Sequence, residues 1–312
     1  MRPICYGLFF PILACNAEGV FGGSEKSIPV PIDLLFVIDN SASMMPESKA
    51  LGQSFERFLD AVDSDLDFQL GVTTSVVESG SGGSLLGDIS VHGDADMQTI
   101  FKQQLFCDAT SWDRDRLPRD ADYACGEEST EVSVEYLDCL CDGGRWDGEG
   151  SSGSQEPLEA ALLSLCRAVE NPPESCFDAG TFSSNATGTE SGFVREDSAV
   201  VIMVVGDSGD GSRRMDLGEE KPEIYLRAFE EFDRDIMFTA IGPNLTRETN
   251  AFICNTAGAN YWMVERLYSM IDDTGGFYRP LEDKTSNNDC ALNPFADHMD
   301  ALADFLSTLS EG

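Results

Sequence analysis

Residues 33–44 read Asp-Leu-Leu-Phe-Val-Ile-Asp-Asn-Ser-Ala-Ser-Met. An unbroken apolar run lies between two aspartates, which is typical of a strand buried on both faces of a parallel sheet. The run ends at Asp39, and Ser41 and Ser43 follow. In open α/β sheets, ligands bind just beyond the carboxyl ends of the strands. The stretch therefore predicts a buried strand and a group of oxygen side chains where such sheets bind ligands.

Similar apolar runs recur along the chain and alternate with helical patterns. Buried strands are predicted over residues 68–74, 199–205 and 236–241, with a short edge strand over 276–278. Apolar residues at helical spacing predict helices near residues 51–62, 157–165, 224–232 and 299–309. Strands that alternate with helices predict an α/β fold, in which a doubly wound, mainly parallel sheet carries helices on both faces.

Two polar segments break this alternation. Residues 75–152 are rich in Gly and Asp, carry four cysteines and include a possible hairpin over 85–91. Residues 171–197 form a second such segment. We expect both to be surface insertions, with little core of their own, in one domain over residues 31–310. The aromatic stretch Tyr261-Trp262-Met263 is expected in the core rather than at an exposed rim.

The N-terminus resembles an export signal. Residues 4–14 are mostly apolar but too few to span a bilayer. Residues 12–15, Ile-Leu-Ala-Cys, are similar to the bacterial lipoprotein cleavage motif. This predicts a signal over residues 1–15, lipid on Cys15, a polar tether over residues 16–30, and a place at the outer membrane or cell surface. The alternative is cleavage after Ala17, which leaves a periplasmic or secreted protein.

Cysteine usage also indicates export. The chain has 10 cysteines, and setting aside Cys5 and Cys15 leaves an even number, which predicts up to four disulfides in an exported chain. Their pairing stays open. The remaining residues are Cys107, Cys125, Cys139, Cys141, Cys166, Cys176, Cys254 and Cys290. A metal cluster around the Cys-x-Cys pair is the alternative, although its spacing is not that of a zinc site.

The charge excludes several classes of partner. The chain has 20 Lys and Arg against 56 Asp and Glu, a formal net charge of −36. Such a surface repels nucleic acid and anionic lipid, so membrane contact is expected only through a lipid anchor. His92 and His298 are too few for a His-rich zinc site. Gly206-Asp207-Ser208-Gly209 resembles a serine-protease nucleophile turn but lacks the expected histidine context.

Asp39, Ser41 and Ser43 place one carboxylate and two hydroxyls in a single turn. Hard oxygen ligands of this kind suit Mg²⁺, with Mn²⁺ or Ca²⁺ as alternatives. The same residue types also commonly cap the helix that follows a strand. The three residues alone leave both interpretations open.

The wider sequence resembles the von Willebrand factor A domain with its metal-ion-dependent adhesion site, in particular a group of exported bacterial proteins. The resemblance covers about residues 31–310 apart from the two polar segments. Residues 33–44 match the first motif, and further matches follow in the family's order at 71–74, 153–162, 192–195 and 205–210. It implies the same doubly wound fold with a divalent cation at the carboxyl edge of the sheet.

The family's site carries over residue by residue. Asp39, Ser41 and Ser43 match its first motif, and Asp207 matches the aspartate that approaches the ion through water. The family's threonine is absent; Glu156 stands near its position, with Gln155 or Ser154 in a shifted register. A carboxylate at this position would lower the net positive charge at the ion. It could then occupy the place that the family gives to an acidic residue of the partner.

We therefore expect a non-enzymatic module that binds a protein or cell-surface ligand through a divalent cation at the bacterial envelope. The alternative is an envelope structural or assembly protein, in which the fold is a scaffold and the 75–152 insertion makes the contacts. The resemblance identifies neither the ligand nor the oligomeric state.

Overall fold

The computed structural model describes residues 30–77, 82–109, 112–120, 122, 124, 131–142, 154–178, 182–216, 219–255 and 258–310. The predicted signal, Cys15 and the predicted tether before residue 30 lie outside these residues, as does Cys125. Within the described part of the chain, no helix has both the length and the apolar character needed to cross a membrane.

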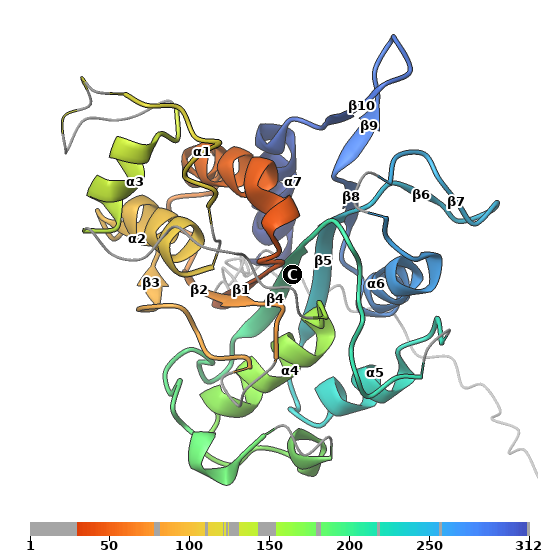
Figure 1. Ribbon diagram of the computed structural model, residues 1–312. Coiled ribbons are helices and arrows are strands. Elements are labelled where there is room, and N and C mark those ends of the chain that lie inside the picture. The colour runs from red at the N-terminus through yellow and green to blue at the C-terminus, as the bar shows by residue number, and fades with distance from the viewer. Residues whose placement is uncertain are drawn as a thin grey trace, which may run out of the picture.

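A six-stranded sheet forms the centre of the fold, in the order β3-β2-β1-β4-β5-β8 (Figure 1). Neighbouring strands run parallel, except that β3 is antiparallel to β2. The strands are β1 (Ile32–Ile38), β2 (Phe68–Thr74), β3 (Ser90–Val91), β4 (Ala199–Val205), β5 (Ile236–Gly242) and β8 (Tyr278–Pro280). The predicted doubly wound, mainly parallel α/β sheet is confirmed.

Helices lie on both faces of this sheet (Figure 1). One pair packs together on the first face, and the other three lie on the opposite face. The first pair is α1 (Met45–Ala61) and α7 (Phe295–Ser310). The other three are α4 (Pro157–Ala168), α5 (Glu223–Glu230) and α6 (Tyr261–Thr274). The two largest hydrophobic clusters of the described residues therefore lie on opposite faces of the sheet.

The central strand β1 is apolar on both sides because it separates these two cores. Phe36 packs in the core on the α1 and α7 face, and its neighbour Val37 packs on the α4 face. All seven residues of β1 are buried. This placement explains the unbroken apolar run, since successive strand residues point to opposite faces of a sheet.

The 75–152 segment contributes to the core, contrary to our expectation of a surface insertion. Phe101 of α2 (Met97–Gln103) and Phe106 of the following π-helical turn (Gln104–Ala109) are buried against α1. The segment is polar on average, so its sequence did not indicate that these large side chains are buried. Their burial is enough to pack the short helices against α1. Of the hairpin expected over 85–91, only β3 forms, paired to β2.

A third short helix in the segment, α3 (Val134–Leu140), carries the Cys-x-Cys pair at its end. Cys141 is bonded to Cys107, and Cys139 is disulfide-bonded as well. Neither cysteine is therefore available for the alternative metal cluster. The other described disulfides are Cys166–Cys176 and Cys254–Cys290.

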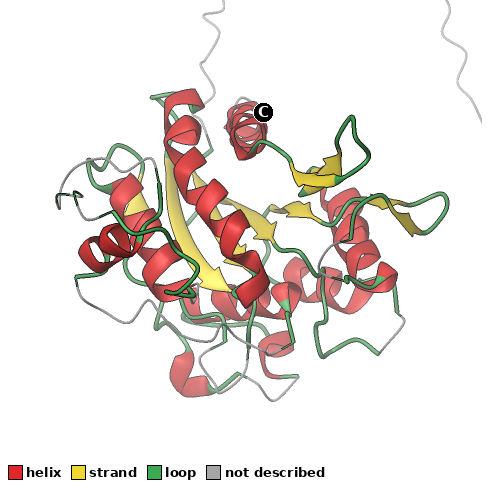
Figure 2. Ribbon diagram, turned by 45° about the horizontal axis from the view of Figure 1, so that its top comes forward, coloured by secondary structure: helices red, strands yellow, loops and turns green. Residues whose placement is uncertain are grey.

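Two small hairpins project from the body of the domain (Figure 2). They are β6 (Leu245–Thr246) with β7 (Ala251–Phe252), and β9 (Glu282–Lys284) with β10 (Cys290–Leu292). The Cys254–Cys290 disulfide connects the segment after β7 to β10. This covalent link joins the chain before α6 to the chain before α7.

The polar residue inside β1 is held by the motif at residues 192–195. Asp33 is fully buried, and it accepts hydrogen bonds from the backbone N of Arg195 at 2.8 Å and from its Nε at 2.7 Å. The Ser198 hydroxyl also donates to Asp33. A buried carboxylate is stable only with such partners. This ion pair connects the end of the second polar segment to the amino edge of the sheet.

Replacing Arg195→Ala should destabilise the domain by about 3 kcal/mol, near the lower limit for breaking a buried ion pair, because Arg195 is itself partly exposed. The free energy of unfolding in urea, with disulfides intact, measures this change. Arg57→Ala is the control, because Arg57 makes a similar two-bond ion pair with Asp300 at the surface. Equal effects of the two substitutions would contradict a special role for the buried pair.

Candidate functional site

Asp39 and Asp207 meet at the carboxyl edge of the sheet. Asp39 directly follows β1, and Asp207 lies two residues beyond β4, the neighbouring strand. The ends of the two strands are in register, Ile38 opposite Val205, and the Asp39 backbone N donates to the Val205 carbonyl at 2.9 Å. The chain continues to β2 on one side of β1, whereas β4 lies on the other. This is the topological switch point at which such sheets bind ligands.

The turn after β1 directs its side chains toward one another. The Ser41 backbone N donates to Asp39 Oδ1 at 2.9 Å, and the Ser41 and Ser43 hydroxyl oxygens lie 2.9 Å apart within hydrogen-bonding distance. The Asp207 carboxyl group is hydrogen-bonded to both Ser43 and Asp39. The structure thus brings together Asp39, Ser41, Ser43 and Asp207. No side chain of this turn caps the helix that follows it.

Ser208 adds a third hydroxyl that our sequence analysis did not assign to the site. Its Oγ donates to Asp39 Oδ2 at 3.0 Å. We had considered this serine only as a protease nucleophile. His92 lies beside Phe68 at the opposite, amino edge of β2, and its Nδ1 is 2.8 Å from the Leu66 carbonyl. The position of Ser208 directly after Asp207 was the available signal.

Glu156 is engaged by an arginine. Its Oε2 accepts from the backbone N and Nε of Arg213 at 2.9 and 2.8 Å, and its Oε1 accepts from Nη2 at 2.6 Å. The neighbouring Gln155, in contrast, lines a small cavity together with Asp39 and Ser75, whose hydroxyl donates to the Gln155 side chain. Ser154 is exposed. Both carboxylate oxygens of Glu156 are therefore occupied by Arg213.

The loop that carries Asp207 is fixed against α4 and α6. Asp210 is fully buried; it accepts from the Leu158 backbone N at 3.2 Å and forms an ion pair with Arg266 of α6 at 3.4 Å. Gly209 has a positive φ of 84°, and a Cβ there would lie 2.9 Å from backbone atoms of α6. Only glycine fits this approach without strain.

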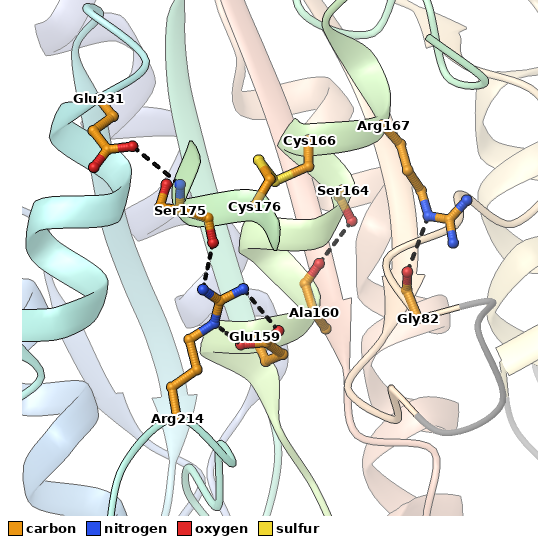
Figure 3. The surroundings of a disulfide bond; sticks show 10 residues. All are labelled: Gly82, Glu159, Ala160, Ser164, Cys166, Arg167, Ser175, Cys176, Arg214 and Glu231. Atoms are coloured by element: carbon orange, nitrogen blue, oxygen red, sulfur yellow. Dashed lines mark hydrogen bonds and ion pairs between the residues drawn. A yellow bond between two sulfur atoms is a disulfide. The ribbon is translucent and has the colours of Figure 1, made fainter. Parts of the chain in front are cut away.

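A second arginine ties the same loop to the disulfide-closed end of α4 (Figure 3). Arg214 Nε donates to Glu159 of α4 at 2.6 Å, and its Nη1 donates to the Ser175 carbonyl. Ser175 lies in a short 3-10 turn (Glu174–Phe177), next to the buried Cys166–Cys176 disulfide. These contacts hold the Asp207 loop in place, so the candidate site is preorganised on rigid elements.

The start of α6 borders the Asp207 loop. Tyr261, Trp262 and Met263 are half-buried there, which corrects our expectation of a core position. The backbone N of Asp210 donates to the Met263 carbonyl at 3.0 Å, and the Trp262 ring lies 4.6 Å from the guanidinium of Arg266. The apolar composition of these three residues predicted burial. They are only half-buried because they form the first turn of α6, and only one side of this turn faces the core.

The structure holds the carboxyl groups of Asp39 and Asp207 close together, which makes it unfavourable for both to be ionised. Burial, and then the charge of Asp39, raise the pKa of Asp207 to about 6. Two carboxyl groups in hydrogen-bonding contact need a shared proton or a cation between them. The donor set of two carboxylates and three hydroxyls fits a hard divalent cation such as Mg²⁺. Among the described residues, no three Asp, Glu, His or Cys side chains form a group that could hold a metal ion.

The chain is similar in structure to von Willebrand factor type A from Catenulispora acidiphila, with 13% identity over 88% of this chain and 42% of that one, at a TM-score of 0.38. It is similar to the pilus adhesin SpaC from Lactobacillus rhamnosus GG in its open conformation, with 10% identity over 90% of this chain and 30% of that one, at a TM-score of 0.41.

A third similar structure is proximal thread matrix protein 1 from the mussel byssus with a zinc-occupied adhesion-site motif, with 10% identity over 92% of this chain and 46% of that one, at a TM-score of 0.34. The chain thus spans less than half the length of these structures. No protein-family model and no curated protein matches it. The functional proposal therefore rests on the chain's own side chains.

The metal-free domain should lose stability as the pH rises from about 4 to about 7. Burial raises the pKa of Asp207 from 3.8 to about 6 and that of Glu47, on α1, from 4.5 to about 7. At these two carboxyl groups the folded state therefore binds more protons than the unfolded state in this window, and together they outweigh the opposite effect of His298, whose pKa is lowered by burial from 6.5 to about 4. Thermal unfolding in EDTA and in Mg²⁺ measures the effect, and Mg²⁺ should reduce the loss. Identical curves with and without Mg²⁺ would contradict a cation at these carboxylates.

Proposed function

We propose that the chain is a divalent-cation-dependent binding module of the von Willebrand factor A type at the bacterial envelope. The observation that carries this proposal is the contact between Asp39 and Asp207 at the switch point of the sheet, surrounded by the hydroxyls of Ser41, Ser43 and Ser208. Carboxylates in contact there repel one another unless a positive charge joins them.

Asp39, Ser41 and Ser43 would hold the cation, which acts as a Lewis acid toward a ligand oxygen when bound. Asp207 would support it through water, and the Ser208 hydroxyl would fix the orientation of Asp39. Arg213 already neutralises Glu156, so this carboxylate does not compete for the cation. A remaining coordination position would then suit a carboxylate of the partner. The expected ligand is therefore an acidic group on a protein or a cell-surface polymer.

The described disulfides support an exported, extracytoplasmic location, because such bonds form and persist in oxidising compartments. We propose that Cys15 is lipidated and that the domain is attached through its tether to the outer membrane or cell surface. We propose no catalytic activity. The competing proposal is an assembly protein whose partner binds through the 75–152 segment without a cation.

Titration with Mg²⁺ and Mn²⁺, followed by calorimetry, tests the proposed site. Asp39→Asn should weaken Mn²⁺ binding by more than 100-fold, and Asp207→Asn by roughly 10- to 100-fold, the range for outer-shell partners. Asp65→Ala, an exposed aspartate at the amino edge of β2, is the matched control. Equal Mn²⁺ affinity of the Asp39→Asn variant and the wild type would overturn the site. Binding to envelope extract that survives EDTA and Asp39→Asn would instead favour the assembly protein.

Substitution of Cys15→Ser should move the full-length protein from the detergent phase to the aqueous phase when it is expressed in a bacterial host. The reason is that a lipoprotein's acyl chains, attached at this cysteine, provide the stable membrane attachment. Cys5→Ser, within the predicted signal, is the control and should leave the partition unchanged. An unmodified, water-soluble wild-type protein would show that ordinary cleavage is the correct alternative.

A further inference from the structure

An open cavity lined by apolar side chains lies at the amino edge of the sheet, opposite the proposed cation site. Its volume is about 820 Å³, and it lies between the first residues of β4 and β5 and the last turns of α5, α6 and α7. Cavities of roughly 300–1,000 Å³ with mainly apolar linings are typical of binding sites. The apolar residues of this amino-edge cavity are Val30, Ala199, Leu226, Phe229, Ile236, Met237 and Leu309.

The charged residues of the amino-edge cavity are mostly acidic. Its three rim carboxylates, those of Glu230, Asp235 and Asp273, belong to exposed residues. A single described basic residue, Arg234, lines the cavity as well, and its guanidinium donates to the Arg195 carbonyl at 3.0 Å. Three carboxylates against one guanidinium favour an occupant that brings a positive charge beside its apolar group.

The chain enters the domain beside this cavity. The Ala199 backbone N donates to the Pro31 carbonyl at 2.9 Å, and Val30 is itself a lining residue, with 38% of its surface exposed. Residues 24–29, which lie outside the described part of the chain, read Ser-Glu-Lys-Ser-Ile-Pro. An isoleucine and a lysine therefore stand two and four residues before Val30. At about 3.3–3.6 Å per residue, both are within reach of the cavity.

We propose that the amino-edge cavity binds the chain's own tether, with Ile28 against the apolar lining and Lys26 paired with one of the rim carboxylates. Val30 is already fixed at the cavity, so the residues next to it have an effective concentration of about millimolar or more. A contact that would be weak between separate molecules is then sufficient, because only a few residues lose conformational entropy. This advantage favours the tether over a separate partner.

Binding of the tether would determine how the domain is connected to its attachment point. The connection between a lipid on Cys15 and the folded domain would be shortened to residues 16–25, which would hold the amino edge of the sheet closer to the membrane. The inference does not depend on the cation site. It also holds for either processing site, because cleavage before Cys15 and cleavage after Ala17 both leave residues 18–29 attached.

Zero-length carbodiimide cross-linking of the exported, processed chain tests this contact, because the reagent joins a lysine to a carboxylate that touches it. We expect Lys26 to be joined to one of the rim carboxylates, and mass spectrometry of the digested protein identifies the link. The positive control is the link between Lys49 and Glu131, whose Nζ and Oε1 atoms are 3.8 Å apart.

Substitution of Ile28→Asp should remove the tether from the cavity. The links from Lys26 to the rim carboxylates should then fall at least fivefold, while the Lys49–Glu131 link is unchanged. The neutral fluorescent probe N-phenyl-1-naphthylamine should bind the wild type weakly, and its fluorescence should rise at least threefold with Ile28→Asp, because the apolar lining is uncovered. Val20→Asp, which places the same charge farther along the tether, is the matched control and should behave as the wild type.

Three results would overturn the proposal. The first is an absence of links from Lys26 to the rim carboxylates when the control link forms, or links that Ile28→Asp does not reduce. The second is a covalent dimer joined through Lys26, which would show that the cavity holds the tether of a second copy. The third is equal probe fluorescence of the wild type and Ile28→Asp. None of these results affects the cation site, which the metal titrations test separately.

Discussion

The contact between the carboxyl groups of Asp39 and Asp207 is the interaction on which the rest of the site depends. Like charges in a buried place separate unless the surrounding structure holds them together. Here the backbone does so, because the two residues follow adjacent strands whose ends are in register. The sheet therefore stores a repulsion that a proton relieves at low pH and a divalent cation can relieve at neutral pH.

Three carboxylates around the site differ from Asp39 and Asp207 because they are paired with arginines. Glu156, Glu159 and Asp210 each have an arginine partner, from Arg213, Arg214 and Arg266 respectively. These pairs neutralise the acids that support the loop, whereas Asp39 and Asp207 are surrounded by serine hydroxyls. In a chain with a net charge of −36 and only 20 basic residues, the described ion pairs neutralise these supporting acids and leave Asp39 and Asp207 without a basic partner.

Much of the fold was predictable, because buried parallel strands have an unmistakable pattern. β2 and β4 have the predicted limits, and Asp39, Ser41 and Ser43 could be placed because they follow a buried strand directly. Two features could not be predicted. The Glu156–Arg213 pair joins residues far apart in sequence, and no periodicity signals such a contact. The burial of the 75–152 segment depends on single residues such as Phe101. One large apolar residue changes the average composition of a long polar segment very little, so the composition did not predict this burial.

The direction of β1 has a consequence for how the domain would be displayed. The chain enters β1 at Ile32 and leaves it at the site, so the two ends of one strand separate the point of attachment from the point of binding. Seven residues at about 3.3 Å each put roughly 20 Å between them. With lipid on Cys15, as proposed, the strand acts as a built-in spacer. The lipid end would face the bilayer, and the cation would be offered to whatever approaches from the surrounding medium.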